Sequence, residues 1–422
     1  MKAISWQTAF GFGKSSLPRD GLHKLLHLVF EKIQSNLQRM NLRAVLYLLV
    51  VSIFSVISSV RAEELRAAWV ASVYNLNFPS HAGLSADLQK DQIHRIVDAA
   101  ARSGLNALMV QVRPEGDALY ESRLEPWSRY LTGVQGLGPG YDPLDYFIQA
   151  GREQGIAIHA WINPYRAATN ASDARASNHE SRELSDALHR IGHGLWLDPG
   201  DPAVREHVVR VVRDIVERYA VAGVILDDYF YPYPSRDYST GSFPDHSFYA
   251  RYGAHSDIGD WRRDNINRLI RDLSETIRET RPGILFGVSP FGIYSKGYPS
   301  NVTAGLDQYR QLYADPVAWL KNGWVDYLSP QLYWRDKSPQ SFSALLEWWR
   351  GPEANPRRIP IYPSIALDRL GGSYGWPSSE IAAQLAIEQS TRPRSAGGFI
   401  LWNVGPLVEN KKGVAAVVAR DR

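Results

Sequence analysis

The segment that decides the fold is Gly223-Val224-Ile225-Leu226-Asp227-Asp228-Tyr229-Phe230-Tyr231-Pro232. Its apolar half suits a strand that is buried on both faces, as the strands of a parallel sheet are. The charges then mark the end of that strand. If the sheet closes into a barrel, catalytic residues gather at the C-terminal ends of its strands. The segment therefore predicts a parallel barrel and a site where acids meet aromatic rings, a combination typical of carbohydrate cleavage.

Short apolar strands alternate with amphipathic helical stretches from residue 63 onward. The eight predicted strands are Leu65–Val73, Ala107–Arg113, Ala157–Asn163, Val224–Asp228, Leu285–Ser289, Val325–Tyr333, Ile359–Ile365 and Gly398–Asn403. The helical patterns between them are Leu88–Ser103, Leu144–Gln154, Ala203–Tyr219, Ile266–Thr280, Ala318–Asn322, Phe342–Trp349 and Ser379–Thr391. This alternation implies parallel pairing through right-handed crossovers.

Eight such units predict a (β/α)₈ barrel of the TIM type over residues 63–422. Long loops follow three of the strands and should lie on the active face: Glu115–Tyr141, Pro164–Leu197 and Tyr231–Asp260. The main alternative, an open doubly wound sheet, is disfavoured because no glycine-rich phosphate turn follows the first strand.

Residues 40–62 carry a targeting pattern. The apolar run Ala44–Val60 follows Arg39 and Arg43, and small residues precede Glu63 as they do at a signal-peptidase cut. We expect a cleaved signal peptide, with an uncleaved membrane anchor as the alternative. Residues 1–39 are interpreted as a separate N-terminal extension, either a cytoplasmic leader or sequence upstream of a start at Met40. The barrel should thus be exported to the periplasm or the cell surface, with contact to a membrane only through this segment.

Charge and cysteine content exclude several classes of protein. Residues 1–62 hold eight of the 47 Lys and Arg and two of the 44 Asp and Glu, so the formal charge of +3 becomes −3 for the remainder. Nucleic-acid binding therefore loses its electrostatic basis. The absence of cysteine excludes disulfides, thiolate metal sites and thiol catalysis.

The predicted strand ends carry the candidate site. Asp227 and Asp228 are the catalytic candidates, because two carboxylates after an apolar strand are costly to hold without a purpose or partners. Amide, guanidinium and ring groups suit the recognition of hydroxyls and of the apolar faces of sugars. The predicted substrate-binding residues are Arg113, Trp161, Asn163, Arg166, Tyr229, Tyr231, Gln331, Tyr333, Trp402 and Asn403.

Structural alternatives exist for several of these residues. Trp161, Tyr333 and Trp402 could be core packing, and Arg113 could form an ion pair with one of the aspartates. Adjacent strand residues point to opposite faces, so Asp227 and Asp228 cannot both face the barrel lumen. His159 lies within a strand and is predicted to be a hydrogen-bonded core residue. No spacing of His, Asp and Glu predicts a metal site, and we expect no cofactor.

The chain resembles the glycosyl hydrolase-like 10 family over nearly all of residues 63–422. The matching segments include Arg66–Ala71, Asn106–Pro114, Asp142–Leu144, His159–Arg166, Trp196–Pro199, Asp227–Pro232, Ser289–Gly292, Ser329–Trp334 and Gly398–Gly405. The resemblance implies an exported TIM-type barrel that acts on bacterial glycan, with peptidoglycan strands stripped of peptides as one target in the family. Gly223–Pro232 is also loosely similar to the fourth-strand signature of chitinases, with Tyr229 where those enzymes place their acid. This likeness implies that, of the two aspartates, Asp227 is the one that faces the barrel lumen.

The favoured interpretation is a glycosidase in which Asp227 or Asp228 protonates the leaving oxygen. The second group could be a carboxylate that acts as nucleophile or base, or the N-acetyl group of the substrate. Weak candidates for a second carboxylate are Glu115, Asp117, Asp336 and Asp368.

Two other functions remain open: a barrel that binds cell-wall glycan without cutting it, and a hydrolase of another exported polysaccharide. The expected partners are a polysaccharide, with peptidoglycan strands as the first candidate, and proteins of cell division or of the envelope.

Overall fold

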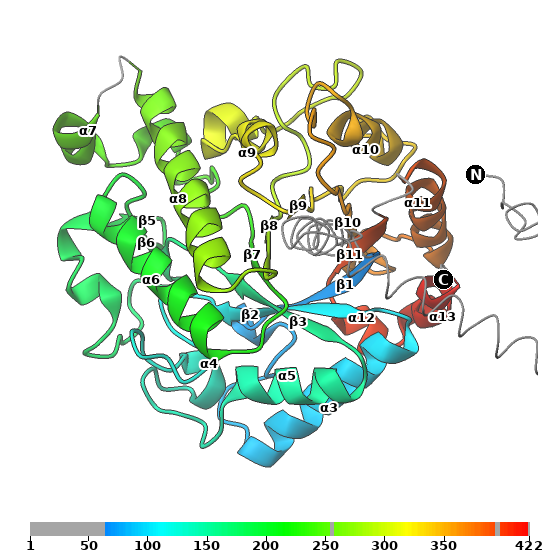
Figure 1. Ribbon diagram of the computed structural model, residues 1–422, viewed down its shortest axis with the longest axis horizontal. Helices are drawn as coiled ribbons and strands as arrows, with labels where there is room; N and C mark the ends of the chain where they lie inside the picture. The colour runs from blue at the N-terminus through cyan, green and yellow to red at the C-terminus, as the bar shows by residue number, and fades with distance from the viewer. Residues whose placement is uncertain (1–63, 254–256, 393–396, 421–422) are drawn as a thin grey trace, which may run out of the picture. The chain divides into compact units, whose positions relative to one another are not determined.

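Eight parallel strands form the central sheet of the protein (Figure 1). The computed structural model describes residues 64–253, 257–392 and 397–420. The strands are β1 (Leu65–Val70), β2 (Ala107–Arg113), β3 (Ala157–Ile162), β7 (Gly223–Leu226), β8 (Leu285–Val288), β9 (Tyr327–Leu328), β10 (Ser364–Ala366) and β11 (Gly398–Trp402). Parallel bridges Leu328↔Ile361 and Gln331↔Ser364 join the last two edges of the sheet. The predicted (β/α)₈ barrel and all eight of its strands are confirmed.

Helices surround the sheet (Figure 1). They are α3 (Ala86–Arg102), α5 (Pro143–Glu153), α6 (Pro202–Arg218), α8 (Ile258–Thr280), α9 (Pro316–Asn322), α10 (Phe342–Arg350) and α11 (Ser378–Thr391), with shorter helices α4 (Arg129–Thr132), α7 (His246–Tyr252), α12 (Gly405–Val408) and α13 (Val414–Ala419). The seven predicted helices are all present. Helix α8 begins at Ile258 rather than Ile266, because the side chain of Asp257 caps it by accepting from Asp260 N–H.

The core has two layers, and alternation along each strand decides which layer a residue joins. Val224 and Leu226 of β7 pack outward against the helices, whereas Ile225 faces the barrel interior. His159 of β3 is also buried in the interior, within 3.2 Å of the Tyr327 hydroxyl. Burial lowers the pKa of His159 to about 4, so it is a neutral, hydrogen-bonded core residue, as expected.

The loop at Pro164–Leu197 contains structure that the sequence did not predict. A small antiparallel sheet of β4 (Arg166–Ala168), β5 (Leu188–Ile191) and β6 (Gly194–Leu197) forms there, in the order β4-β6-β5. A tight turn with Gly192 at φ 56° joins β5 to β6. Strands of three and four residues are too short to show a clear alternating pattern. The sheet fixes Trp196, whose indole N–H donates to the carbonyl of Phe230 at 2.8 Å.

The predicted N-terminal extension (residues 1–39) and signal or anchor segment (residues 40–62) lie outside the described residues. Within the described ranges, no helix combines the length and the apolar character that crossing a bilayer requires.

Candidate active site

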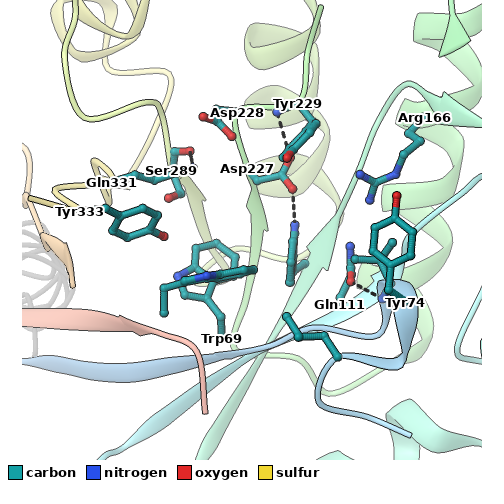
Figure 2. Close-up of a pocket in the computed structure, with 14 residues that line it drawn as sticks. Trp69, Tyr74, Gln111, Arg166, Asp227, Asp228, Tyr229, Ser289, Gln331 and Tyr333 are labelled. Atoms are coloured by element: carbon teal, nitrogen blue, oxygen red, sulfur yellow. Dashed lines mark hydrogen bonds between the residues drawn. The ribbon is translucent and has the colours of Figure 1, made fainter. Parts of the chain in front are cut away.

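A cavity of about 350 Å³ opens where the barrel strands end (Figure 2). Its volume is in the range of small-molecule sites. It is lined by Trp69, Val73, Tyr74, Leu76, Gln111, Trp161, Arg166, Asp227, Asp228, Tyr229, Ser289, Gln331, Tyr333 and Trp402. Both catalytic candidates and six of the predicted substrate-binding residues therefore share one cavity.

Asp227 is held by donors from two neighbouring strands. Its Oδ2 accepts from the indole N–H of Trp161 at 3.0 Å and from the side-chain amide of Asn163, while its Oδ1 accepts from the backbone N–H of Tyr229 at 3.1 Å. The pKa of Asp227 lies above its usual value, because burial outweighs the opposing effects of Arg166 and of these three donors. Arg166 and the donors limit the rise, since they favour the ionised carboxylate.

Asp228 lies in a different environment beside it. The carboxyl group is buried, and it accepts a short hydrogen bond from the Tyr233 hydroxyl. Burial, followed by the charge of Asp227, raises the pKa of Asp228 to about 7. A carboxyl group with this pKa is half protonated at neutral pH, as a general acid needs to be.

The two aspartates do not face opposite sides as predicted. Strand β7 ends at Leu226, so the alternation of side chains that applies within a strand does not extend to Asp228. Asp227 continues the inward direction of Ile225, and the chain then turns, which brings Asp228 to the same cavity. Figure 2 shows the two carboxylates side by side above the aromatic floor.

Three indoles form the floor of the cavity. Trp69, Trp161 and Trp402 meet edge to face, with ring centroids 4.9 to 6.3 Å apart. Arg166 and Tyr74 lie on one side of the cavity in Figure 2, and Tyr333 and Gln331 lie on the other. Flat apolar rings bordered by hydrogen-bonding groups can hold a sugar ring by its C–H face and its hydroxyls.

Four predicted substrate-binding residues do not line the cavity. Asn163 lies behind Asp227 and positions it. Asn403 accepts from Asn77 Nδ2 at 2.8 Å. Tyr231 is fully buried among Phe243 and Tyr313.

Arg113 is the fourth of these residues, and it is fully buried in a network of its own. Its guanidinium donates to both oxygens of Glu125 and to Glu180 Oε2, and its Nη1 donates to the carbonyls of Asn163 and Pro164. His207 Nε2 lies 2.9 Å from Glu125 and 3.0 Å from Glu180. The alternative that Arg113 pairs with Asp227 or Asp228 is thus wrong, because its two partners are glutamates of the active-face loops.

The ligand atoms of Glu125, Glu180 and His207 lie within 4.8 Å of one another, which is close enough for a metal ion. Arg113 already occupies this group, and the two glutamates raise the pKa of His207 to about 9 despite its burial. Two carboxylates therefore face two cations. The sequence could not reveal this network, since its members come from a strand, two loops and a helix.

The sequence reasoning missed the segment after β1. Val73, Tyr74 and Leu76 of this segment line the cavity, as does Trp69 within β1, which was not predicted as a site residue either. The first strand was predicted to continue to Val73, but it ends at Val70, and the residues beyond it form the rim. A tyrosine directly after the predicted strand was the available signal.

The weak candidates for a second carboxylate do not line the cavity. Glu115 pairs with Arg129 at 3.0 Å, and Asp117 accepts from Gln135 at 3.0 Å. Asp336 accepts from Ser343 N–H at the start of α10. Asp368 interacts with Trp402 at the rim. Among the described residues, Asp227 and Asp228 are the only carboxylates that line the cavity.

Comparisons with known proteins agree with this geometry. Residues 64–374 match the sequence profile of a family described as Glycosyl hydrolase-like 10. Glycosyl hydrolase YngK of Bacillus subtilis (strain 168) is 36% identical over 370 residues, which cover 85% of this chain and 71% of that protein. Glycosyl hydrolase DigH of Escherichia coli (strain K12) is 34% identical over 338 residues, which cover 74% of each chain. The glycoside hydrolase domain of PgaB (BpsB) from Bordetella bronchiseptica superposes with a TM-score of 0.52 at 13% identity, and the match covers 84% of this chain and 98% of that one.

Proposed function

This chain belongs to the glycosyl hydrolase-like 10 family and is a glycosidase, and we propose that it cleaves bacterial cell-wall glycan, first of all peptidoglycan strands. The observation that carries the mechanism is the pair of adjacent carboxylates in an aromatic cavity: burial raises the pKa of both, but Asp227 meets a cation and donors that favour its ionised form, whereas Asp228 stays protonated to near neutral pH. Two carboxylates whose environments separate their pKa values are typical of acid catalysis at a glycosidic bond.

Asp228 is the proposed general acid. Its proton passes to the glycosidic oxygen as the bond from that oxygen to the anomeric carbon breaks. The same group then accepts a proton from the water that completes hydrolysis. Tyr233 donates to the carboxylate left behind, so the charge that forms during the first step has a partner.

Asp227 is the proposed stabiliser of the positive charge that develops on the sugar. Because the cavity holds no third carboxylate among the described residues, we propose that the acetamido oxygen of the substrate attacks the anomeric carbon. Asp227 then accepts from the acetamido N–H. This route requires an N-acetylated sugar next to the cleaved bond, and peptidoglycan supplies one.

The proposed place of action is outside the cytoplasmic membrane. The support for it is the apolar run at 44–60 with its basic flank and its small residues before position 63. Cell-wall glycan is found there.

The test is product analysis by mass spectrometry after incubation with purified glycan strands, with and without stem peptides. We expect oligosaccharides with new reducing ends from the wild type and none from Asp228→Asn. Asp91→Asn, which changes an exposed carboxylate on α3, serves as the matched control and should keep full activity. Retention of the wild type on glycan without any release of product would replace the enzyme by a glycan-binding barrel.

A second experiment tests the acetamido route. Substrates whose N-acetyl group carries one, two or three fluorines have a progressively weaker acetamido nucleophile. We expect kcat/KM to fall steeply along this series. A rate that does not change with fluorination would exclude the acetamido route and point to a carboxylate nucleophile or base.

A further inference from the structure

A second cavity of about 340 Å³ lies beside the active cavity. It lies between α3 and α12, two helices that pack against each other and are neighbours in Figure 1. Its apolar wall comes from Leu76, Ile96 and Val408, and its polar wall includes Gln92, Arg95 and Glu409. The proposed mechanism uses none of these residues except Leu76, which also lines the active cavity.

The two cavities share part of their lining. Leu76 lines both of them. The short stretch 402–404 also borders both cavities, because Trp402 lines the active cavity and Val404 lines the second one. The side-chain oxygen of Asn403 accepts from Asn77 Nδ2 at 2.8 Å and from Gly405 N–H at 3.0 Å, which fastens the two segments together.

The segment between the cavities is held in an exposed and strained shape. Tyr74 is 72% exposed and Leu76 is 52% exposed, although both are large and apolar. Tyr74 and Asn75 adopt φ values of 58° and 51°, in the left-handed region that non-glycine residues seldom occupy. Asn75 holds this shape by donating to the carbonyls of Pro79 and Tyr130, both at 2.9 Å. Strained backbone of this kind persists only where the surrounding structure holds it in place, and it is often found at binding sites.

The polar wall of the second cavity suits a ligand rich in hydroxyls. Arg95 and Glu409 have opposite charges, and within the described ranges no hydrogen bond or ion pair engages either side chain. Together with Gln92 they offer both donors and acceptors. Sugar hydroxyls can both donate and accept, so they can pair with all three side chains.

We propose that the second cavity binds sugar units of the same glycan strand whose cleavage point occupies the active cavity. This inference rests on the proposed function and extends it to the binding of the rest of the strand. The strand crosses Leu76 and continues along the cavity between α3 and α12. The enzyme then prefers long strands to short oligosaccharides and cleaves within them. The ligand class is a stretch of polysaccharide, recognised through ring faces on Leu76 and Val408 and through hydroxyls on Arg95 and Glu409.

The test uses two variants that change the second cavity alone. Val408→Trp fills it from an exposed position on α12, and Arg95→Ala removes a donor. We expect the ratio of kcat/KM on long strands to kcat/KM on a disaccharide substrate to fall about tenfold in each, since a lost contact of about 1.4 kcal/mol is a factor of ten. The matched controls are Leu88→Trp, at a 50% exposed position of α3, and Arg102→Ala, at the end of the same helix. Neither control should change the ratio.

A binding measurement separates this inference from the proposed function. Affinity for oligosaccharides of increasing length is measured by calorimetry with the Asp228→Asn protein, which does not turn over its ligand. We expect affinity to rise with length, and Val408→Trp to abolish the rise. The same outcome, together with a wild type that releases no product from the strands, would support the second cavity and refute the proposed function. Affinity that does not depend on length, or a rise that Val408→Trp leaves intact, would overturn the second cavity as a binding site.

Discussion

Replacing Asp228 by asparagine should stabilise the protein while it abolishes catalysis. The fold raises the pKa of this carboxyl group from 3.8 to about 7, chiefly through burial. A raised pKa in an acid means that the folded state resists ionisation. At low pH the carboxyl group is neutral in both the folded and the unfolded state, so its raised pKa costs no stability. As the pH rises above about 4 the unfolded chain ionises first, and the cost to stability grows until about pH 7, where it levels off.

The size of the effect follows from this difference in pKa. A difference of about 3 corresponds to about 4 kcal/mol at pH 8, because one pKa unit is worth about 1.4 kcal/mol, whereas only about 2 kcal/mol is reached at pH 5. Asparagine carries no charge and escapes this cost. The substitution also removes one acceptor oxygen next to Tyr233, but that loss is nearly the same at both pH values. The gain at pH 8 should therefore exceed the gain at pH 5 by about 2 kcal/mol.

The assay is urea unfolding of the wild type and of Asp228→Asn at about pH 5 and about pH 8. Asp91→Asn should change the free energy of unfolding by less than about 0.5 kcal/mol at either pH, as is usual for an exposed position. A difference between wild type and Asp228→Asn that is equal at both pH values would refute the reasoning, because the carboxyl group would then titrate alike in the folded and unfolded states.

Four further outcomes are expected. The kcat/KM of the wild type should fall as the pH rises above about 7, where Asp228 loses its proton; a profile that stays flat to about pH 9 would exclude it as the acid. Trp161→Phe removes a donor to Asp227, so the pKa of Asp227 should rise and the acidic limb of the pH profile should move to higher pH. His207→Gln should destabilise the protein below about pH 6.5, and this deficit should shrink as the pH passes about 9, where the wild-type imidazolium loses its proton; urea unfolding at three pH values tests it. Arg113→Lys should cost about 3 kcal/mol of unfolding free energy in thermal unfolding, since lysine cannot donate in parallel to the buried carboxylates.

The sequence predicted the barrel well because the strands are apolar runs of a recognisable length, separated by amphipathic helices. The errors lie where strands end. Placing the end of β1 at Val73 rather than Val70 put Val73, which lines the cavity, inside the strand. Extending β7 through Asp228 sent that side chain away from the cavity that it lines. Alternation is a property of extended, paired backbone, and the sequence alone does not show where the pairing stops.

Contacts between distant segments were beyond reach for another reason. Arg113 was rightly seen as a cation near the strand ends, but its partners Glu125 and Glu180 come from two long loops whose paths no local pattern determines. Each of these buried charges needs an oppositely charged partner, and how the loops pack decides which residue that partner is. The predicted substrate-binding role of Arg113 failed on this point, whereas Arg166 lies in the cavity with its guanidinium 5.3 Å from the Tyr229 ring centre.

The network around Arg113 nevertheless reaches the catalytic pair. Arg113 donates to the carbonyls of Asn163 and Pro164, and the side chain of Asn163 in turn donates to Asp227. The donor from Asn163 opposes the rise in the pKa of Asp227 that burial causes, and the charge of Asp227 is one cause of the raised pKa of Asp228. Two identical side chains that are adjacent in sequence thus acquire different roles, because Asp227 lies near the cation Arg166 whereas Asp228 lies near the anion Asp227. It follows that substitutions at Arg113, outside the cavity, should change the pH profile of catalysis as well as stability.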